Sequence, residues 1–212
     1  MNAREEILSR IRTALGETQT NPSASHSTIT RSFTRHGSLD APSALHLLVD
    51  RLVDYDSTII EVTREDELAA AIAQALADEN ETNCLVAPEF PSTWLPQNIT
   101  FKVDHYLPTN DIEGIPAVVT TCELAVASTG TIFLVHEGAQ GRRIITLLPD
   151  HHICLVRRDQ VVETIPESFP LLAGKTTKPI TTISGPSATS DIEMTRIKGV
   201  HGPRRLTVIF YG

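Results

Sequence analysis

The chain has 212 residues, 41% of them hydrophobic and 21% charged, which is typical of a globular protein and enough for one large α/β domain. Its formal net charge of −8 argues against general nucleic-acid binding. No apolar run approaches the ~20 residues that span a bilayer, so we expect no membrane insertion. Residues 1–15 lack the apolar core of a signal peptide, which predicts a cytoplasmic protein.

Charge is distributed unevenly along the chain. Residues 1–129 hold 8 basic and 19 acidic residues, a net charge of −11, whereas residues 130–212 hold 10 and 7, a net charge of +3. The second half also contains three arginine pairs, at 142–143, 157–158 and 204–205. A basic half of an acidic protein suits a small anion such as a phosphate or a carboxylate. The alternative, which any single pair favours when taken alone, is that these arginines are solvated strand ends.

The three cysteines predict buried thiols in a reducing compartment. Cys84, Cys122 and Cys154 are far apart, and each lies in an apolar run. No two of them have CxxC spacing. We therefore expect neither an iron–sulfur cluster nor a structural zinc ion in this chain.

Hydrophobic periodicity predicts three regions. Ile7, Leu8, Ile11 and Leu15 share one face of a helix over residues 3–15, so residues 1–16 form an N-terminal helical extension. Residues 17–43 are rich in Ser, Thr, Asn and Pro and predict a linker. Residues 44–212 form the α/β domain. The first helix could dock on a partner or pack on its own domain.

Helical and strand patterns alternate within the α/β domain. A helix is predicted over residues 44–53, and Thr63-Arg-Glu-Asp66 resembles a capping box that opens a second helix ending near Leu76. Strands are predicted at eight places: Ser57–Val62, Cys84–Ala87, Phe101–Val103, Ala117–Thr120, Thr131–Val135, His152–Val156, Thr181–Ile183 and Leu206–Phe210. Short apolar strands separated by helices predict an α/β fold with a parallel or mixed sheet covered on both faces.

The segment 120–131 is the first candidate site. It is predicted to run from a strand through a brief helix to a Thr129-Gly130-Thr131 turn, whose amides and hydroxyls suit an oxyanion. The alternative is that Gly130 only permits a tight turn. Glu123, at the start of the brief helix, is a candidate acid–base group, although exposed glutamates are common at helix starts.

Two further segments carry cationic or imidazole groups. The loop 138–143 offers Arg142 and Arg143 to a carboxylate or phosphate, or it is an ordinary hairpin loop. On a strand, His152 and Cys154 point to one side and His151 to the other. Two soft ligands on one face are too few for a metal site, so we expect hydrogen-bonded structural histidines and no metal.

The segment 184–193 gives the strongest local signal. Gly185 and Pro186 turn the chain after a strand, and the polar residues that follow predict the start of a helix, whose free amides and dipole favour an anion. The same residues could instead cap the helix internally. His201, flanked by Gly-Val and Gly-Pro, could close the same pocket, and Asp191 is a weak catalytic candidate. The binding candidates here are Ser184, Gly185, Ser187, Thr189, Asp191 and His201.

These motifs together resemble one family over nearly the whole chain. The matching segments are Ala3–Leu8 with Arg10-Ile-Arg, Ser128–Thr131, Gly141–Arg143, Leu148–Cys154, Ser184–Glu193 and Gly199–Arg205. The pattern is similar to the lactate-utilisation protein C family, which is built on the LUD domain. One residue departs from it, because the family usually has an acidic residue where this chain has Ser128.

The resemblance implies a doubly wound, mainly parallel sheet of the NagB/RpiA/CoA-transferase-like type. It also implies a role in oxidising L-lactate to pyruvate, with two partners: a cysteine-rich protein and a ferredoxin-like iron–sulfur protein. Iron–sulfur clusters are then expected on the partners and no cofactor in this chain.

Three functions stay open at this point. The chain is an accessory or small-anion-binding subunit of the lactate system, a stand-alone enzyme acting on a phosphorylated or CoA-linked small acid, or a sensor of a small anion. A fold that supports many functions cannot choose among them.

Overall fold

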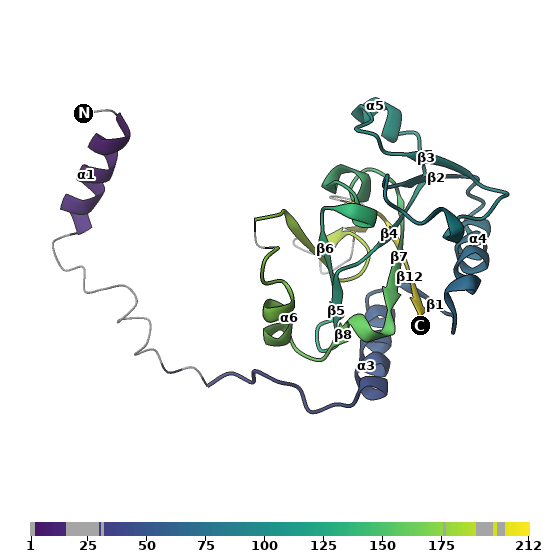
Figure 1. The fold of residues 1–212 in the computed structure, drawn as a ribbon, viewed down its shortest axis with the longest axis horizontal. Helices are drawn as coiled ribbons and strands as arrows, with labels where there is room; N and C mark the ends of the chain where they lie inside the picture. The colour runs from purple at the N-terminus through teal and green to yellow at the C-terminus, as the bar shows by residue number, and fades with distance from the viewer. Residues whose placement is uncertain (1–2, 16–29, 31, 176, 190–196, 199–201) are drawn as a thin grey trace. The chain divides into compact units, whose positions relative to one another are not determined.

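The computed structural model describes residues 3–15, 30, 32–175, 177–189, 197–198 and 202–212 (Figure 1). The chain divides into two compact units, Met1–Thr34 and Arg35–Gly212. The first contains the predicted helix, α1 (Ala3–Leu15), in which no residue is buried. Residues 17–29 and 31 of the predicted linker lie outside the described residues, whereas residues 30 and 32–43 are described. No helix in the described ranges is long and apolar enough to cross a membrane.

The second unit is built on a six-stranded sheet with the order β1-β12-β7-β4-β2-β3. Every neighbouring pair in it is parallel. All six strands were predicted from the sequence, and the predicted α/β class with a mainly parallel sheet is confirmed. The strands are β1 (Thr58–Glu61), β2 (Asn83–Val86), β3 (Thr100–Val103), β4 (Ala117–Thr121), β7 (His151–Arg157) and β12 (Arg205–Tyr211).

A second sheet of four short strands has the order β8-β5-β6-β9. Strand β6 runs antiparallel to both β5 and β9, and β5 pairs in parallel with β8. A further two-stranded pair, β10 with β11, is antiparallel. The bounds are β5 (Leu124–Val126), β6 (Thr131–Val135), β8 (Val161–Val162), β9 (Ile180–Ile183), β10 (Ala188–Thr189) and β11 (Ile197–Lys198).

Two of the helices, α4 and α6, cover the outer faces of the two sheets. Figure 1 shows α4 and α6 on opposite sides of the second unit, with the two sheets between them. The α-helices are α3 (Ala41–Asp54), α4 (Leu68–Asp78), α5 (Thr109–Ile112) and α6 (Ile165–Leu171). The 3-10 helices are η1 (Glu65–Glu67), η2 (Ser92–Trp94), η3 (Gly138–Gln140), η4 (Arg143–Thr146) and η5 (Arg158–Gln160).

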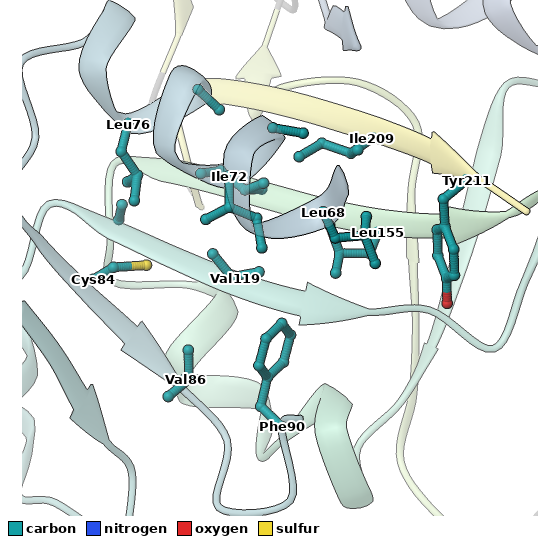
Figure 2. Packing of buried hydrophobic residues seen from close by; sticks show 14 residues of the cluster. Leu68, Ile72, Leu76, Cys84, Val86, Phe90, Val119, Leu155, Ile209 and Tyr211 are labelled. Atoms are coloured by element: carbon teal, nitrogen blue, oxygen red, sulfur yellow. The ribbon is translucent and has the colours of Figure 1, made fainter. Parts of the chain in front are cut away.

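Helix α4 packs on one face of the six-stranded sheet (Figure 2). Leu68, Ile72 and Leu76 recur every four residues, so they lie on one side of the helix, and all three are fully buried. They pack in one cluster with strand residues such as Val119 and Ile209. Burying this apolar surface provides the main stabilisation of that layer.

Helix α3 and the smaller sheet cover the other face. Leu48 and Leu52 of α3 are fully buried in a cluster with Val208 and Phe210 of β12. The helix begins at Ala41, three residues before the predicted start, because Asp40 caps it by accepting a hydrogen bond of 3.0 Å from the amide of Ser43.

The start of α4 differs from the prediction. The predicted capping box placed the acidic partner at Asp66, but Glu67 accepts the amide hydrogen bonds of Thr63 and Arg64 at 2.9 and 3.0 Å. These bonds stabilise the short helix η1, and α4 itself begins only at Leu68.

The brief helix predicted between β4 and the Thr-Gly-Thr turn is wrong, because this segment forms strand β5. All three residues of β5 are buried, and the amide of Glu123 donates to the carbonyl of Phe133 at 2.9 Å. Pairing on both edges, with β6 and β8, provides hydrogen bonds that an isolated helical turn could not. Glu123 therefore precedes a strand.

The helix predicted to start at Ser184 is also wrong over the described residues 184–189. Gly185 forms a turn with φ of +83°, the amide of Ser187 donates to the carbonyl of Pro203 at 2.8 Å, and Ala188 begins β10. Pairing with a later segment of the chain thus replaces helical hydrogen bonding. Asp191 and the rest of the motif lie outside the described residues.

The packing of α3 leads to a test of stability. We expect Leu48→Ala to lower the free energy of unfolding by about 2–5 kcal/mol, because it leaves a cavity where a fully buried side chain contacted the sheet. Val53→Ala, on the same helix but 55% exposed, should change it by less than about 0.5 kcal/mol. Urea denaturation measures both, and equal effects would contradict this account of the core.

Candidate functional site

A cavity of about 320 Å³ lies beside the amino ends of β7 and β12, where His152 and Leu206 line it. The remaining wall comes from η4, from β9 and from the loops that follow β9 and precede β12. Its polar lining residues include Arg143, His152, Thr181, Ser184 and Ser187. A concave site with few polar groups among apolar ones is the usual form of a small-molecule pocket.

Several predicted binding residues meet at this cavity. Arg143, Ser184, Gly185 and Ser187 all line it. Gly202 and Pro203, which directly follow the predicted His201, line it as well. His201 itself, Asp191 and the side chain of Thr189 lie outside what the structure describes.

The Thr-Gly-Thr turn reaches the cavity through a row of hydroxyl groups. The Thr129 and Thr131 hydroxyls are 2.7 Å apart, and the Thr131 hydroxyl is 2.9 Å from that of Ser184. The two turns that the sequence singled out therefore lie side by side. Thr129, Gly130 and Thr131 are not among the residues that line the cavity.

Two glycines in these turns are required by close packing on α3. Gly130 has φ of +60°, and a Cβ atom there would lie 2.8 Å from Cβ of Arg51. Gly185 has φ of +83°, and its Cβ would lie 2.4 Å from Cβ of Tyr55. Packing against the end of α3 is thus sufficient to explain both glycines.

The two neighbouring arginines have different partners. Arg142 forms a two-pronged ion pair with Asp104, with N–O distances of 2.6 and 2.7 Å, and the Asp104 side chain is only 2% exposed. Arg142 therefore anchors the loop after β3 and does not line the cavity. Arg143 lines it, and the structure shows no carboxylate paired with Arg143 among the residues that it describes.

His136 and Thr181 hold the guanidinium of Arg143. Burial lowers the pKa of His136, so its ring is neutral near pH 7. Nδ1 lies 3.2 Å from the carbonyl oxygen of Gly141, which can only accept, and Nε2 therefore accepts from the Thr181 hydroxyl at 2.7 Å. The Thr181 oxygen in turn accepts from Arg143 at 3.0 Å. This chain of hydrogen bonds orients the exposed Arg143 side chain at the cavity.

The two adjacent histidines of β7 point to opposite sides of the sheet, as the alternation along a strand predicts. His151 binds Glu81 through Nδ1 at 2.7 Å and Thr207 through Nε2 at 2.8 Å. His152 lines the cavity, and its Nε2 is 2.8 Å from the Thr120 hydroxyl. Burial lowers the pKa of His152 to about 3, so its ring is neutral at physiological pH.

The sequence did not single out His152, His136 or Thr181 as binding residues. His152 was expected to be a structural histidine, and its hydrogen bond to Thr120 fits that prediction. Its place at the amino end of a strand, next to the loops, is the one signal in the sequence that could have indicated a binding role. His136 and Thr181 come together only through the pairing of β6 with β9, for which the sequence carries no local signal.

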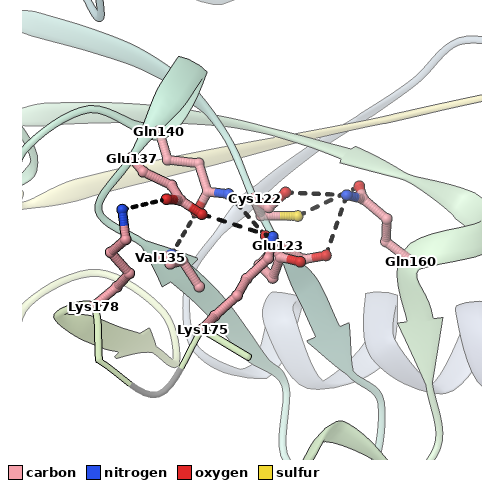
Figure 3. A network of polar contacts seen from close by, with 8 residues as sticks. All are labelled: Cys122, Glu123, Val135, Glu137, Gln140, Gln160, Lys175 and Lys178. Carbon is pink, nitrogen blue, oxygen red and sulfur yellow. Dashed lines mark hydrogen bonds and ion pairs between the residues drawn. The ribbon is translucent and has the colours of Figure 1, made fainter. Parts of the chain in front are cut away.

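Glu123 lies in a separate polar network at the carboxyl end of β4 (Figure 3). Its carboxylate accepts from Lys175 at 2.7 Å and from Gln140 at 3.3 Å. Lys178 pairs with Glu137 at 2.9 Å in the same network. Glu123 is not among the residues that line the cavity, and these contacts join the segment before β9 to the strands beside it.

Comparison with other proteins identifies the family. The LUD domain model matches residues 45–211, so the chain belongs to the LUD domain family, and the resemblance read from its motifs is confirmed. A crystal structure of a DUF162 family protein from Deinococcus radiodurans superposes with a TM-score of 0.73 and 38% identity, covering 82% of this chain and 100% of that one.

Relatives by sequence have a common name. A Deinococcus radiodurans protein called "Lactate utilization protein C" is 42% identical over 177 residues, which are 82% of each chain. The Bacillus mycoides "Lactate utilization protein C 1" is 33% identical over 97 residues, 43% of this chain and 41% of that protein. The similarity to this second relative thus spans less than half of either protein.

Because His152 is buried and neutral in the folded protein, we expect the free energy of unfolding to depend on pH. The unfolded chain binds a proton at His152 near pH 6.5 and the folded one only near pH 3, so stability is complete above pH 6.5 and falls with pH below it. Between pH 7 and pH 5 we expect His152 alone to account for a loss of about 2 kcal/mol. The His152→Gln variant stays neutral, so over the same pH range its free energy of unfolding should fall by about 2 kcal/mol less than that of the wild type. Urea unfolding at the two pH values tests this, and parallel losses would contradict it.

Proposed function

We propose that this chain is a subunit of a lactate-utilisation system that binds a small 2-hydroxy or 2-oxo carboxylate, such as L-lactate or pyruvate, in the cavity beside β7. The observation that carries the proposal is Arg143 at the cavity, held by Thr181 and His136 and free of a carboxylate partner among the described residues. A guanidinium oriented in this way is well suited to a carboxylate. The name shared by the relatives supplies the class of acid.

The size and chemistry of the cavity support a small acid. Its volume of about 320 Å³ lies at the lower end of the range for ligand pockets. Besides the guanidinium of Arg143, the described lining residues offer the hydroxyls of Ser184 and Ser187, which can both donate and accept hydrogen bonds. These groups match a molecule with one carboxylate and one further oxygen.

We propose further that the electron carriers of the system reside on partner proteins. Oxidation of lactate to pyruvate releases two electrons and two protons, so an acceptor must be supplied. This chain has three cysteines, all buried, whereas common iron–sulfur clusters use four cysteine thiolates. An accessory, acid-binding role beside a cysteine-rich protein and a ferredoxin-like iron–sulfur protein follows from the family resemblance. Copurification of both with this chain from cells grown on lactate, together with loss of growth on deletion, is the expected result.

The first test of the acid site is calorimetric binding of L-lactate and pyruvate. We expect Arg143→Gln to weaken binding at least 10-fold, because a charge-assisted hydrogen bond contributes about 1.5–3 kcal/mol. Arg157→Gln removes the same charge at the carboxyl end of β7, where the side chain pairs with Asp159, and should leave affinity unchanged. Equal affinities in both variants would place the acid elsewhere.

A second test addresses the group that positions Arg143. We expect Thr181→Val to weaken binding of the same acids about 2- to 10-fold, since it removes one neutral hydrogen bond that orients the guanidinium. Thr181→Ser keeps the hydroxyl and should bind like the wild type. If Thr181→Val and Thr181→Ser bind the acids with the same affinity, the Thr181 hydroxyl does not orient Arg143.

A further inference from the structure

The His152 side chain contains a buried nitrogen with no hydrogen-bond partner. The residue is 1% exposed and lines the cavity, and its Nε2 contacts Thr120. Its Nδ1 is one of two buried side-chain polar atoms, together with Oγ of Ser57, that lack a partner in the described part of the chain. Buried polar atoms are nearly always hydrogen-bonded. An unpartnered nitrogen on a residue that lines a cavity therefore indicates that a ligand in the cavity supplies the missing hydrogen-bond partner.

The contact with Thr120 determines which ring nitrogen holds the proton. Thr120 is fully buried, and His152 is the partner that the structure gives to its hydroxyl group. If Nε2–H donated to Thr120, both the threonine hydrogen and the Nδ1 lone pair would be left without partners. If the threonine donates to Nε2, only one group is left over. The favoured tautomer therefore has its proton on Nδ1, which makes that nitrogen a donor.

We propose that Nδ1–H of His152 donates a hydrogen bond to the oxygen on C2 of the bound acid, while Arg143 binds the carboxylate. This inference rests on the proposed function and adds the group that recognises the second oxygen. A neutral donor suits an uncharged oxygen, and the guanidinium suits the charged one. The proposal makes His152 a specificity-determining residue.

The consequence is discrimination by the presence of an oxygen on C2. Pyruvate and propionate share the carboxylate and the number of carbons, but propionate has a methylene group in place of the carbonyl. Bound propionate would leave the buried donor without an acceptor. A site built to hydrogen-bond a substrate oxygen rejects strongly the analogue that lacks it.

Two variants of His152 separate its two nitrogens. The side-chain amide nitrogen of asparagine can take the position of Nδ1, whereas that of glutamine can take the position of Nε2. By calorimetry we expect the wild type and His152→Asn to bind pyruvate at least 10-fold more tightly than propionate. His152→Gln should bind the two acids within about 2-fold of each other. Circular dichroism and thermal melting establish that each variant is folded.

Three outcomes would overturn the inference. They are a preference for pyruvate that survives in His152→Gln, loss of the preference in both folded variants, and equal binding of the two acids by the wild type. If the wild type binds the two acids equally but Arg143→Gln still weakens their binding, the proposed carboxylate site is retained and only the role of His152 fails. If neither acid binds, the proposed function itself fails, and the role of His152 fails with it.

A second measurement needs no ligand. Two-bond proton–nitrogen correlation spectra of the 15N-labelled full chain report which ring nitrogen of each histidine holds the proton. Comparison with His152→Gln assigns the His152 signal. We expect the Nδ1–H tautomer in the wild type, and an Nε2–H tautomer would overturn the inference whatever the acids do.

Discussion

Strand β7 begins with two adjacent histidines inside the six-stranded sheet, and each imidazole needs polar partners in layers that are otherwise apolar. The pleat directs them to opposite faces. On the side of α4, His151 is satisfied at both nitrogens by Glu81 and Thr207, and Glu81 also pairs with Arg205 at 2.8 Å. On the other side, Thr120 satisfies one nitrogen of His152 and leaves the second unpaired. The cavity lies on the side of His152, where β9 and the loop after it meet β7 and β12.

The smaller sheet connects the core to the cavity. Strand β6 contributes buried Ile132 and Leu134 to the cluster beneath α3, and it pairs with β9, whose Thr181 holds Arg143. Two turns at the same end of this pair, before β6 and after β9, pack against α3 through Gly130 and Gly185. A substitution in the apolar layer beneath α3 would therefore shift groups at the cavity as well as lower stability.

The sequence predicted the strands of the large sheet because each is a short apolar run, which is a local property. It failed where pairing over long distances decides the structure. Leu124–Val126 is too short for its period to distinguish strand from helix, and partners on both edges make it a strand. The polar residues after Ser184 suit a helix cap or a turn equally, and the bond from Ser187 to Pro203 decides for the turn. Likewise, nothing local separates Arg142 from Arg143, since Asp104 lies 38 residues from the first of them.

Parallel α/β sheets usually bind ligands at the carboxyl ends of their strands, where the helices that follow begin and present free amides. In this protein the carboxyl ends carry ion pairs that satisfy one another, Asp104 with Arg142 after β3 and Glu123 with Lys175 after β4. The cavity lies at the amino ends of β7 and β12, where Gly185 of its wall packs against Tyr55 at the end of α3. The anion that we propose for this cavity is bound by side-chain donors such as Arg143. Among the described lining residues, one guanidinium with a few neutral donors suits the single charge of a carboxylate better than the double charge of a phosphate, which supports the small monocarboxylate that we propose over a phosphorylated acid.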